Sequence, residues 1–213
     1  MRVERLARDP RPLLVGCVRG LHAETYPLID LLERSAPGAL GLALSAEELD
    51  GIATYFAEAD GETVIHLVDS ETREIEALAE WGEVRVPNPS MVRAIEWARA
   101  RDVPVHPLDP SDEGSAQMFT AHIGYVELVR RTLRERRLGR HPPRAETPDE
   151  FAVAWERTLH AGTGSRSLAV ERDRHLVAEA RRRLRSADRP AIVVDRERFD
   201  RIRAFLEETT GPE

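Results

Sequence analysis

Ionisable side chains stand directly after several apolar runs of this sequence. Arg19 and His22 follow one such run, Asp109 ends another, and Arg198 follows the last. In open α/β sheets, ligands bind beyond the carboxyl ends of the strands. Histidine and carboxylate groups there can hold a cation, whereas arginine binds an anion through its planar fork of N–H groups. These four residues are therefore candidate ligand-binding residues.

Arg172 and its neighbour Glu171 are two further candidates. Both lie in the segment AVERDRHLVAEARRRL, 169–184, whose apolar spacing predicts a helix. Glu171 and Asp173 would occupy the first turn, where the helix dipole favours carboxylates. An arginine between them is electrostatically unfavourable unless it serves a partner. We therefore expect Arg172 to contact either a carboxylate at a neighbouring strand end or a bound anion.

Several kinds of chemistry are excluded by residue type. All 31 residues counted as lysine or arginine are arginines, so a lysine nucleophile or Schiff base cannot form. Cys17 is the only cysteine, and its apolar surroundings predict a core residue rather than a nucleophile. The phosphate-loop, HExxH and GxSxG patterns are missing. We predict no bound metal and no cofactor.

Apolar runs and amphipathic segments alternate through the first half of the chain and again at its end. This pattern predicts parallel strands joined by helices. The expected strands are 12–18, 39–44, 61–69, 83–86, 103–109 and 190–194. We expect an α/β fold whose mainly parallel sheet has about five or six strands and is flanked by helices. The first and last of these strands should be neighbours.

Helix starts are indicated by capping residues. The stretches SAEE at 45–48 and TPDE at 147–150 each place a serine or threonine three residues before a glutamate. Thr25, Ser70 and Ser90 are expected to begin three more helices.

A helical insert is expected at about 115–165, before the last strand, within a single domain of residues 1–213. The insert begins with one long helix and includes an arginine-rich stretch at 130–144 and a loop at 160–167. The arginine-rich stretch has few aromatic residues, which is more typical of a surface for a protein or acidic partner than of a nucleic-acid platform. Self-association through the insert is an alternative use.

Composition places the chain among soluble globular proteins. Hydrophobic residues make up 41% and charged residues 32%, and the formal net charge is −7. The negative charge argues against nucleic acid as the main partner. No apolar stretch approaches the roughly 18–20 residues that span a bilayer, and the first ten residues do not form a secretory signal. We therefore expect a cytoplasmic protein without a membrane span.

The order of elements resembles the TraB/PrgY family and, more distantly, the Tiki and GumN-like proteins. The sequence VGCVRG, 15–20, stands where the family has VG-T-x-H after its first strand. LALS at 42–45 stands in place of a V-E-L-D pattern, and ERDRHLVAEARRRL at 171–184 is the closest match to a family motif. AIVVDRERFDRIRAFLEE at 191–208 replaces VVGAGHxxGI and its helix. PSMVRAIEWARARDVPVHPLD, 89–109, resembles the family's helix leading into a strand that ends in I-D.

The resemblance implies an α/β fold and a metal-dependent peptidase chemistry based on histidine and glutamate. The family's first histidine falls on Arg19, unless a shift brings His22 into that role. Its glutamate falls on Ala43 and its last histidine on Arg198. Alanine offers no ligand atom, and guanidinium stays protonated and cannot bind a cation. The resemblance therefore implies a pseudoenzyme that has lost the metal site and acts in binding or regulation.

Two interpretations of the arginines remain open. Arg19, Arg172 and Arg198 can converge into a pocket for an unknown small anion, or they can form ion pairs with nearby carboxylates such as Asp195.

Two other functions are alternatives. One is a metal-dependent hydrolase with a shifted site made of His22, Glu24, Asp109 and Glu171. The other is an interaction scaffold for a protein partner that uses the helical insert.

Overall fold

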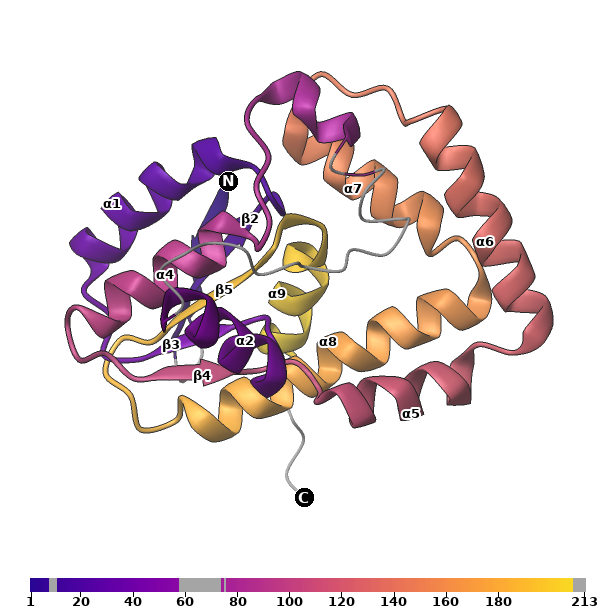
Figure 1. Ribbon diagram of the computed structural model, residues 1–213. Coiled ribbons are helices and arrows are strands. Elements are labelled where there is room, and N and C mark those ends of the chain that lie inside the picture. The colour runs from indigo at the N-terminus through magenta and orange to yellow at the C-terminus, as the bar shows by residue number, and fades with distance from the viewer. Residues whose placement is uncertain (8–10, 58–73, 75, 209–213) are drawn as a thin grey trace.

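A five-stranded sheet lies at the centre of the protein (Figure 1). The computed structural model describes residues 1–7, 11–57, 74 and 76–208. The strand order is β1-β2-β5-β3-β4, with only the β1–β2 pair antiparallel. The strands are β1 Arg2–Arg5, β2 Leu13–Cys17, β3 Leu40–Leu42, β4 Val105–Pro107 and β5 Ala191–Asp195. The predicted α/β class and mainly parallel sheet are confirmed.

The last strand in the chain, β5, lies beside the first apolar strand, β2, as predicted. β2 and β5 pair in parallel from Leu13 opposite Ala191 to Cys17 opposite Asp195. Every residue of both strands is buried, because helices cover both faces of the sheet. The edge strand β1 was not predicted, since its sequence RVER alternates charged and apolar residues without an apolar run.

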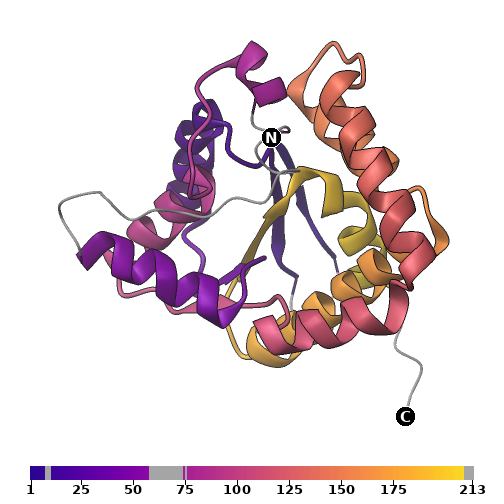
Figure 2. The ribbon, with the colours of Figure 1, turned by 45° about the vertical axis from the view of Figure 1, so that its right-hand side comes forward.

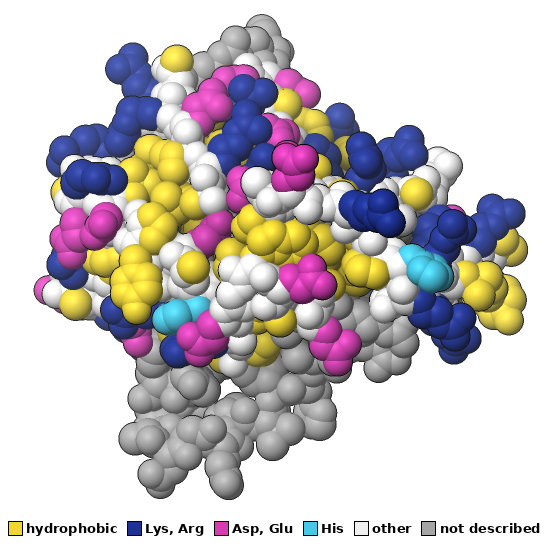
Figure 3. Space-filling view, turned by 90° about the horizontal axis from the view of Figure 1, so that it is seen from above, with side chains coloured by type: hydrophobic (Ala, Val, Ile, Leu, Met, Phe, Trp, Pro, Cys, Tyr) yellow, Lys and Arg dark blue, Asp and Glu magenta, His cyan; other side chains and the backbone are white. Residues whose placement is uncertain are grey.

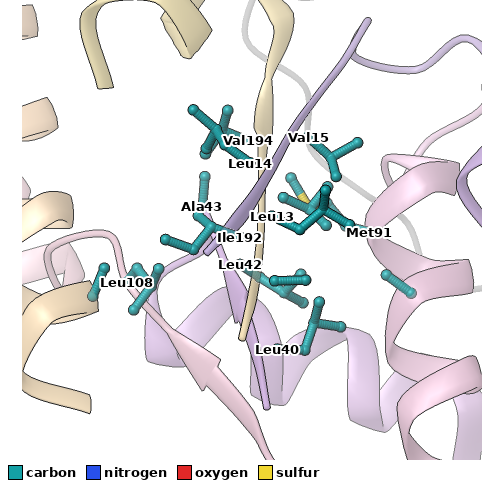
Figure 4. Packing of buried hydrophobic residues seen from close by; sticks show 14 of the residues in the cluster. Leu13, Leu14, Val15, Leu40, Leu42, Ala43, Met91, Leu108, Ile192 and Val194 are labelled. Atoms are coloured by element: carbon teal, nitrogen blue, oxygen red, sulfur yellow. The ribbon is translucent and has the colours of Figure 1, made fainter. Parts of the chain in front are cut away.

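Helices cover the two faces of the sheet (Figures 1 and 2). α1 and α4 pack together on one face, and α8 and α9 on the other. In Figure 4, Met91 of α4 lies on the same side as Leu13 and Val15, whereas Leu14 and Val194 point to the opposite side. The helices are α1 Thr25–Ser35, α2 Ala46–Ala57, α4 Pro89–Arg99, α5 Asp112–His122, α6 Tyr125–Arg140, α7 Pro148–Leu159, α8 Thr163–Arg183 and α9 Phe199–Glu207.

Three short 3₁₀ helices complete the described elements: η1 His22–Glu24, η2 Ala79–Trp81 and η3 Arg196–Arg198. A helical region, α5 to α8, precedes the last strand. The predicted strand at 61–69 and the start of the helix expected at Ser70 lie outside the described residues.

The helix predicted at 169–184 begins earlier than its sequence indicates. α8 starts at Thr163, so the expected loop 160–167 is reduced to three residues and Arg172 lies in the third turn. The reason is tertiary packing. A Cβ at Gly164 would stand 2.3 Å from the His122 carbonyl oxygen, so a residue without a side chain lets α8 pack against the end of α5. The first-turn explanation of Glu171 and Arg172 was therefore wrong.

The single long helix predicted at the start of the insert is two helices. α5 ends at His122, and α6 begins after Gly124, whose backbone is extended. Ile123 between them is buried, so the chain turns where that side chain enters the interior. The predicted strand at 83–86 is also absent from the described fold, where Val84 forms only an isolated bridge with Leu21.

Two of the predicted helix starts are confirmed in atomic detail. Ser45 and Glu48 exchange side-chain and backbone hydrogen bonds as a capping box, and the Thr147 hydroxyl accepts from the Glu150 N–H. Two others differ. Asn88 rather than Ser90 caps α4, and the Thr25 hydroxyl donates to the His22 carbonyl instead of capping α1.

Candidate functional site

Charged side chains gather at the carboxyl ends of the parallel strands. Asp195 is the last residue of β5, and Asp109 follows β4, where its N–H donates to the Leu44 carbonyl. Arg196–Arg198 continue from β5 as η3 and bring Arg198 over the sheet edge. The edge predicted to hold the site therefore carries ionic groups from two strands and from the element that follows β5.

Arg198 is the centre of this ionic cluster. Its two terminal nitrogens donate to both oxygens of Asp109, each at 2.7 Å, and its Nε donates to Asp173 at 2.7 Å. All three side chains are buried. Burial opposes ionisation of Asp109, but attraction and hydrogen bonds from Arg198 outweigh it, so the pKa of Asp109 lies below its usual value. Arg198 is thus fixed in place by ion pairs with two buried aspartates.

Arg172 and Arg19 form a matched pair of half-exposed arginines on buried carboxylates. Arg172 Nη2 donates to Asp109 at 3.1 Å and Arg19 Nη2 to Asp195 at 2.8 Å; each arginine side chain is 42% exposed and each aspartate 4%. The Arg172 Nε is buried and has no hydrogen-bond partner in the described structure. A buried donor without a partner is costly.

Glu197 lies beside Asp195 with its Oε2 buried and without a hydrogen-bond partner in the described part of the chain. Burial and repulsion from Asp195 raise the pKa of Glu197 well above its usual value, against the attraction of Arg19. The strand-end cluster therefore contains a carboxyl group that resists ionisation.

A pocket of about 200 Å³ opens beside the ionic cluster. Its lining residues come from helices α5 to α9, from η3 and from His160 at the end of α7, so the helical region forms most of its wall. Its lining combines four arginines and a histidine with two carboxylates and a small apolar side. The lining residues are Ser115, Phe119, Arg131, Glu156, His160, Leu168, Ala169, Arg172, Asp173, Arg198 and Arg201.

The carboxylates of the pocket are already engaged. Asp173 accepts from both Arg198 and Arg201, each at 2.7 Å. Glu156 lies 3.3 Å from the His160 Nε2. Burial opposes ionisation of Glu156, but His160 and Arg201 outweigh it, and the pKa of Glu156 is lowered. These carboxylates therefore offer little acceptor capacity to a ligand.

The arginines of the pocket keep unused donors. Arg201 uses its Nε on Asp173 and lies 3.8 Å from Glu156, which is too long for a hydrogen bond. Arg131 uses its Nε on Glu135 at 3.0 Å. Since each guanidinium carries five N–H donors, Arg131, Arg172 and Arg201, which line the pocket, all keep donors that no acceptor among the described residues uses. The site is therefore rich in donors, and its four arginines outnumber its two carboxylates.

The sequence-predicted residues divide into two groups. Arg172 and Arg198 both line the pocket and both bind Asp109, which is not itself a lining residue. Arg19 pairs with Asp195 and does not line the pocket. Glu171 is paired with His122 on an exposed part of α8.

The four residues of the shifted metal site are not brought together. Glu24 accepts from the Val18 N–H and pairs with the amino group of Met1, His22 precedes it in η1, and Asp109 is bound by Arg198. Among the described residues, no three His, Cys, Asp or Glu side chains gather as they would around a metal ion.

Sequence reasoning missed the pocket residues that come from the helical region. Glu156 and His160 stand four residues apart and share a helix face, which is the one local signal available. Arg131 lies in the arginine-rich stretch at 130–144, where nothing distinguishes it from its neighbours, and Arg201 lies within a helix.

A scan against models of known protein families finds no match, and a search of curated proteins finds none either. In the part of the chain described here, no helix has the length and apolar character needed to cross a bilayer.

Proposed function

We propose that the protein is a binding protein for a small organic anion, which it takes up in the pocket between the strand ends and the helical region. The observation that carries this proposal is the set of guanidinium groups at Arg131, Arg172 and Arg201, which line the pocket and have N–H donors that no acceptor in the described part of the chain uses. Arginine forks suit carboxylate and phosphate oxygens in geometry as well as in charge.

The size and lining of the pocket narrow the ligand class. About 200 Å³ is below the usual range of drug-sized ligand sites, which is about 300–1,000 Å³. Phe119 and Leu168 add apolar surface to the lining that the arginines share. A ligand that satisfies both kinds of surface is a short acid, with one carboxylate or phosphate group and a small apolar body.

Binding is favoured over metal-dependent hydrolysis by the residues at the strand ends. As part of the proposal we keep the relationship to the TraB/PrgY family, in which the metal positions correspond to Arg19, Ala43 and Arg198. Two of these hold arginines that are ion-paired to Asp195 and Asp109. None of the three side chains can ligate a cation.

Thermal unfolding in added anions tests the proposal. Inorganic phosphate or benzoate should raise Tm above the value in chloride of equal ionic strength, because a ligand that binds only the folded state stabilises it. At about one hundred times Kd the gain is roughly 2.7 kcal/mol, or on the order of 5–10 °C for a chain of this length.

The matched arginine pair supplies the control. Arg172→Gln should abolish the anion-specific rise, whereas Arg19→Gln should retain it, although both variants lose an equally exposed ion pair to a buried aspartate. Equal Tm shifts in chloride, phosphate and benzoate, or equal loss in both variants, would leave only the structural ion pairs and remove the anion site.

A further inference from the structure

The outward side of α6 carries apolar and cationic side chains without partners in the described fold. Tyr125 is 81% and Leu133 58% exposed, which is unusual for large hydrophobic residues on a surface helix. The outer strip of α6 comprises Tyr125, Val126, Val129 and Leu133, followed by Arg136, Arg137 and Arg140, with Arg130 beside them.

The acidic residues of α6 point away from this strip. Glu127 pairs with Arg134 at 2.6 Å and accepts from the Ser165 hydroxyl, and Glu135 pairs with Arg131. Both glutamates are therefore already neutralised on the inner side of the helix. The outer strip consequently has a net positive charge, although the chain as a whole has a formal net charge of −7.

The position of α6 makes this strip accessible. α6 lies at the outer edge of the molecule in Figures 1 and 2 and packs inward on α7 and α8. In Figure 3, yellow and dark-blue side chains lie next to one another at the right-hand end, where α6 lies in Figure 1. The strip is thus a protruding surface, and it is separate from the pocket, which Arg131 lines from the inner side of α6.

We propose that the outer strip of α6 binds the surface of an anionic lipid bilayer. A bilayer accepts a convex apolar helix face by insertion, while arginines beside it contact the headgroup phosphates with their stems in the interface. Tyrosine is suited to the same boundary, because its ring is apolar and its hydroxyl polar. Nucleic acid would use the arginines but would gain nothing from Val129 and Leu133.

The same surface does not favour a second copy of the chain. Two copies of the strip would bring two positively charged arginine clusters together. Their repulsion is destabilising when no carboxylates lie between them. An anionic surface complements the strip in charge, and it needs no matching groove. The binding is peripheral, since α6 is too short and too charged to cross a bilayer.

Vesicle co-sedimentation of the full chain tests this proposal. We expect binding to vesicles of equal parts phosphatidylglycerol and phosphatidylcholine, little binding to phosphatidylcholine alone, and weaker binding in high salt. The triple variant Arg136→Gln, Arg137→Gln, Arg140→Gln and the double variant Val129→Gln, Leu133→Gln should each weaken binding by about tenfold or more.

A charge-matched variant distinguishes the strip from general electrostatics. Arg5, Arg34 and Arg185 are exposed in other parts of the fold, and their triple replacement by glutamine should leave vesicle binding unchanged. Equal loss in both triple variants would overturn the proposal, as would full binding by the Val129, Leu133 variant. Failure of the wild type to bind phosphatidylglycerol vesicles would also overturn it and leave an acidic protein as the partner. Circular-dichroism melts confirm that each variant is folded.

Discussion

At the scale of single residues, Asp109 faces two guanidinium groups at once. Arg198 binds both of its oxygens and Arg172 binds one. Replacing it by asparagine would leave the buried Arg198 without its bidentate counter-charge. We expect Asp109→Asn to reduce the free energy of unfolding by about 3–5 kcal/mol.

Urea unfolding measures this loss, with Asp30→Asn as a control on the exposed side of α1. The control should change stability by less than about 0.5 kcal/mol. A loss below about 1 kcal/mol for Asp109→Asn would mean that the Arg198 cluster does not hold the strand ends together.

Glu197 makes the stability of the folded protein depend on pH. Its pKa is raised in the folded state by burial and by Asp195, so the unfolded chain releases the proton first as pH rises. The contribution of Glu197 to stability is complete below its unfolded pKa of about 4.3 and declines as pH rises towards its folded pKa.

Glu197→Gln removes this titration. The variant should therefore melt at a higher temperature than the wild type at pH 8 and at nearly the same temperature at pH 4. Melting curves at the two pH values measure the difference. A variant that is less stable at pH 8 would show that the Glu197 carboxylate is stabilised by Arg19 rather than penalised by burial.

Residues of the site differ in how far the sequence predicts them. Asp109 and Arg198 follow from a rule about strand ends, whereas Arg172 was selected on a first-turn position that it does not occupy. Arg131, Glu156 and Arg201 enter the pocket only because α6, α7 and α9 pack around it. Their positions depend on how the helices pack, which no local pattern in the sequence encodes.

At the scale of elements, close packing decides where α8 begins. Gly164 allows α8 to approach the His122 carbonyl, whereas Gly51 in α2 has open space around its Cβ position. Gly164→Ala should destabilise the fold by about 1–3 kcal/mol through a backbone clash. Gly51→Ala should stabilise it by about 0.5–1 kcal/mol, because alanine favours a helix.

Differential scanning calorimetry of the two glycine variants tests this contrast. If both variants gained stability, the contact between α5 and α8 would not determine the start of α8. The same contact explains why the residue composition wrongly predicted a loop at 160–167. HAGTGSRS has residues that are typical of a loop, and only its packing makes most of it helical.

Elements with strong local signals were predicted well. β2 and β5 are uniform apolar runs, and the caps at Ser45 and Thr147 are set by residues within one helical turn. The break between α5 and α6 was missed because the apolar spacing continues through Ile123 and Gly124, although the chain turns there.

At the scale of the whole molecule, the helical region packs against the carboxyl end of the sheet. The ionic cluster on Asp109 holds η3 and α8 to the end of β4, and α5 to α7 close the pocket above it. The alternation of strands and helices predicts the sheet, but not the packing of the helical region against its carboxyl end. The pocket is a property of that packing.

Titration calorimetry with benzoate and with inorganic phosphate tests the central claim most directly. The account predicts saturable binding of at least one of these anions at one site per chain, abolished in Arg201→Gln and retained in Arg19→Gln. The account would be contradicted if the wild type gave no binding heat with either anion and the two anions did not compete. It would also be contradicted if binding survived in Arg201→Gln and was lost in Arg19→Gln.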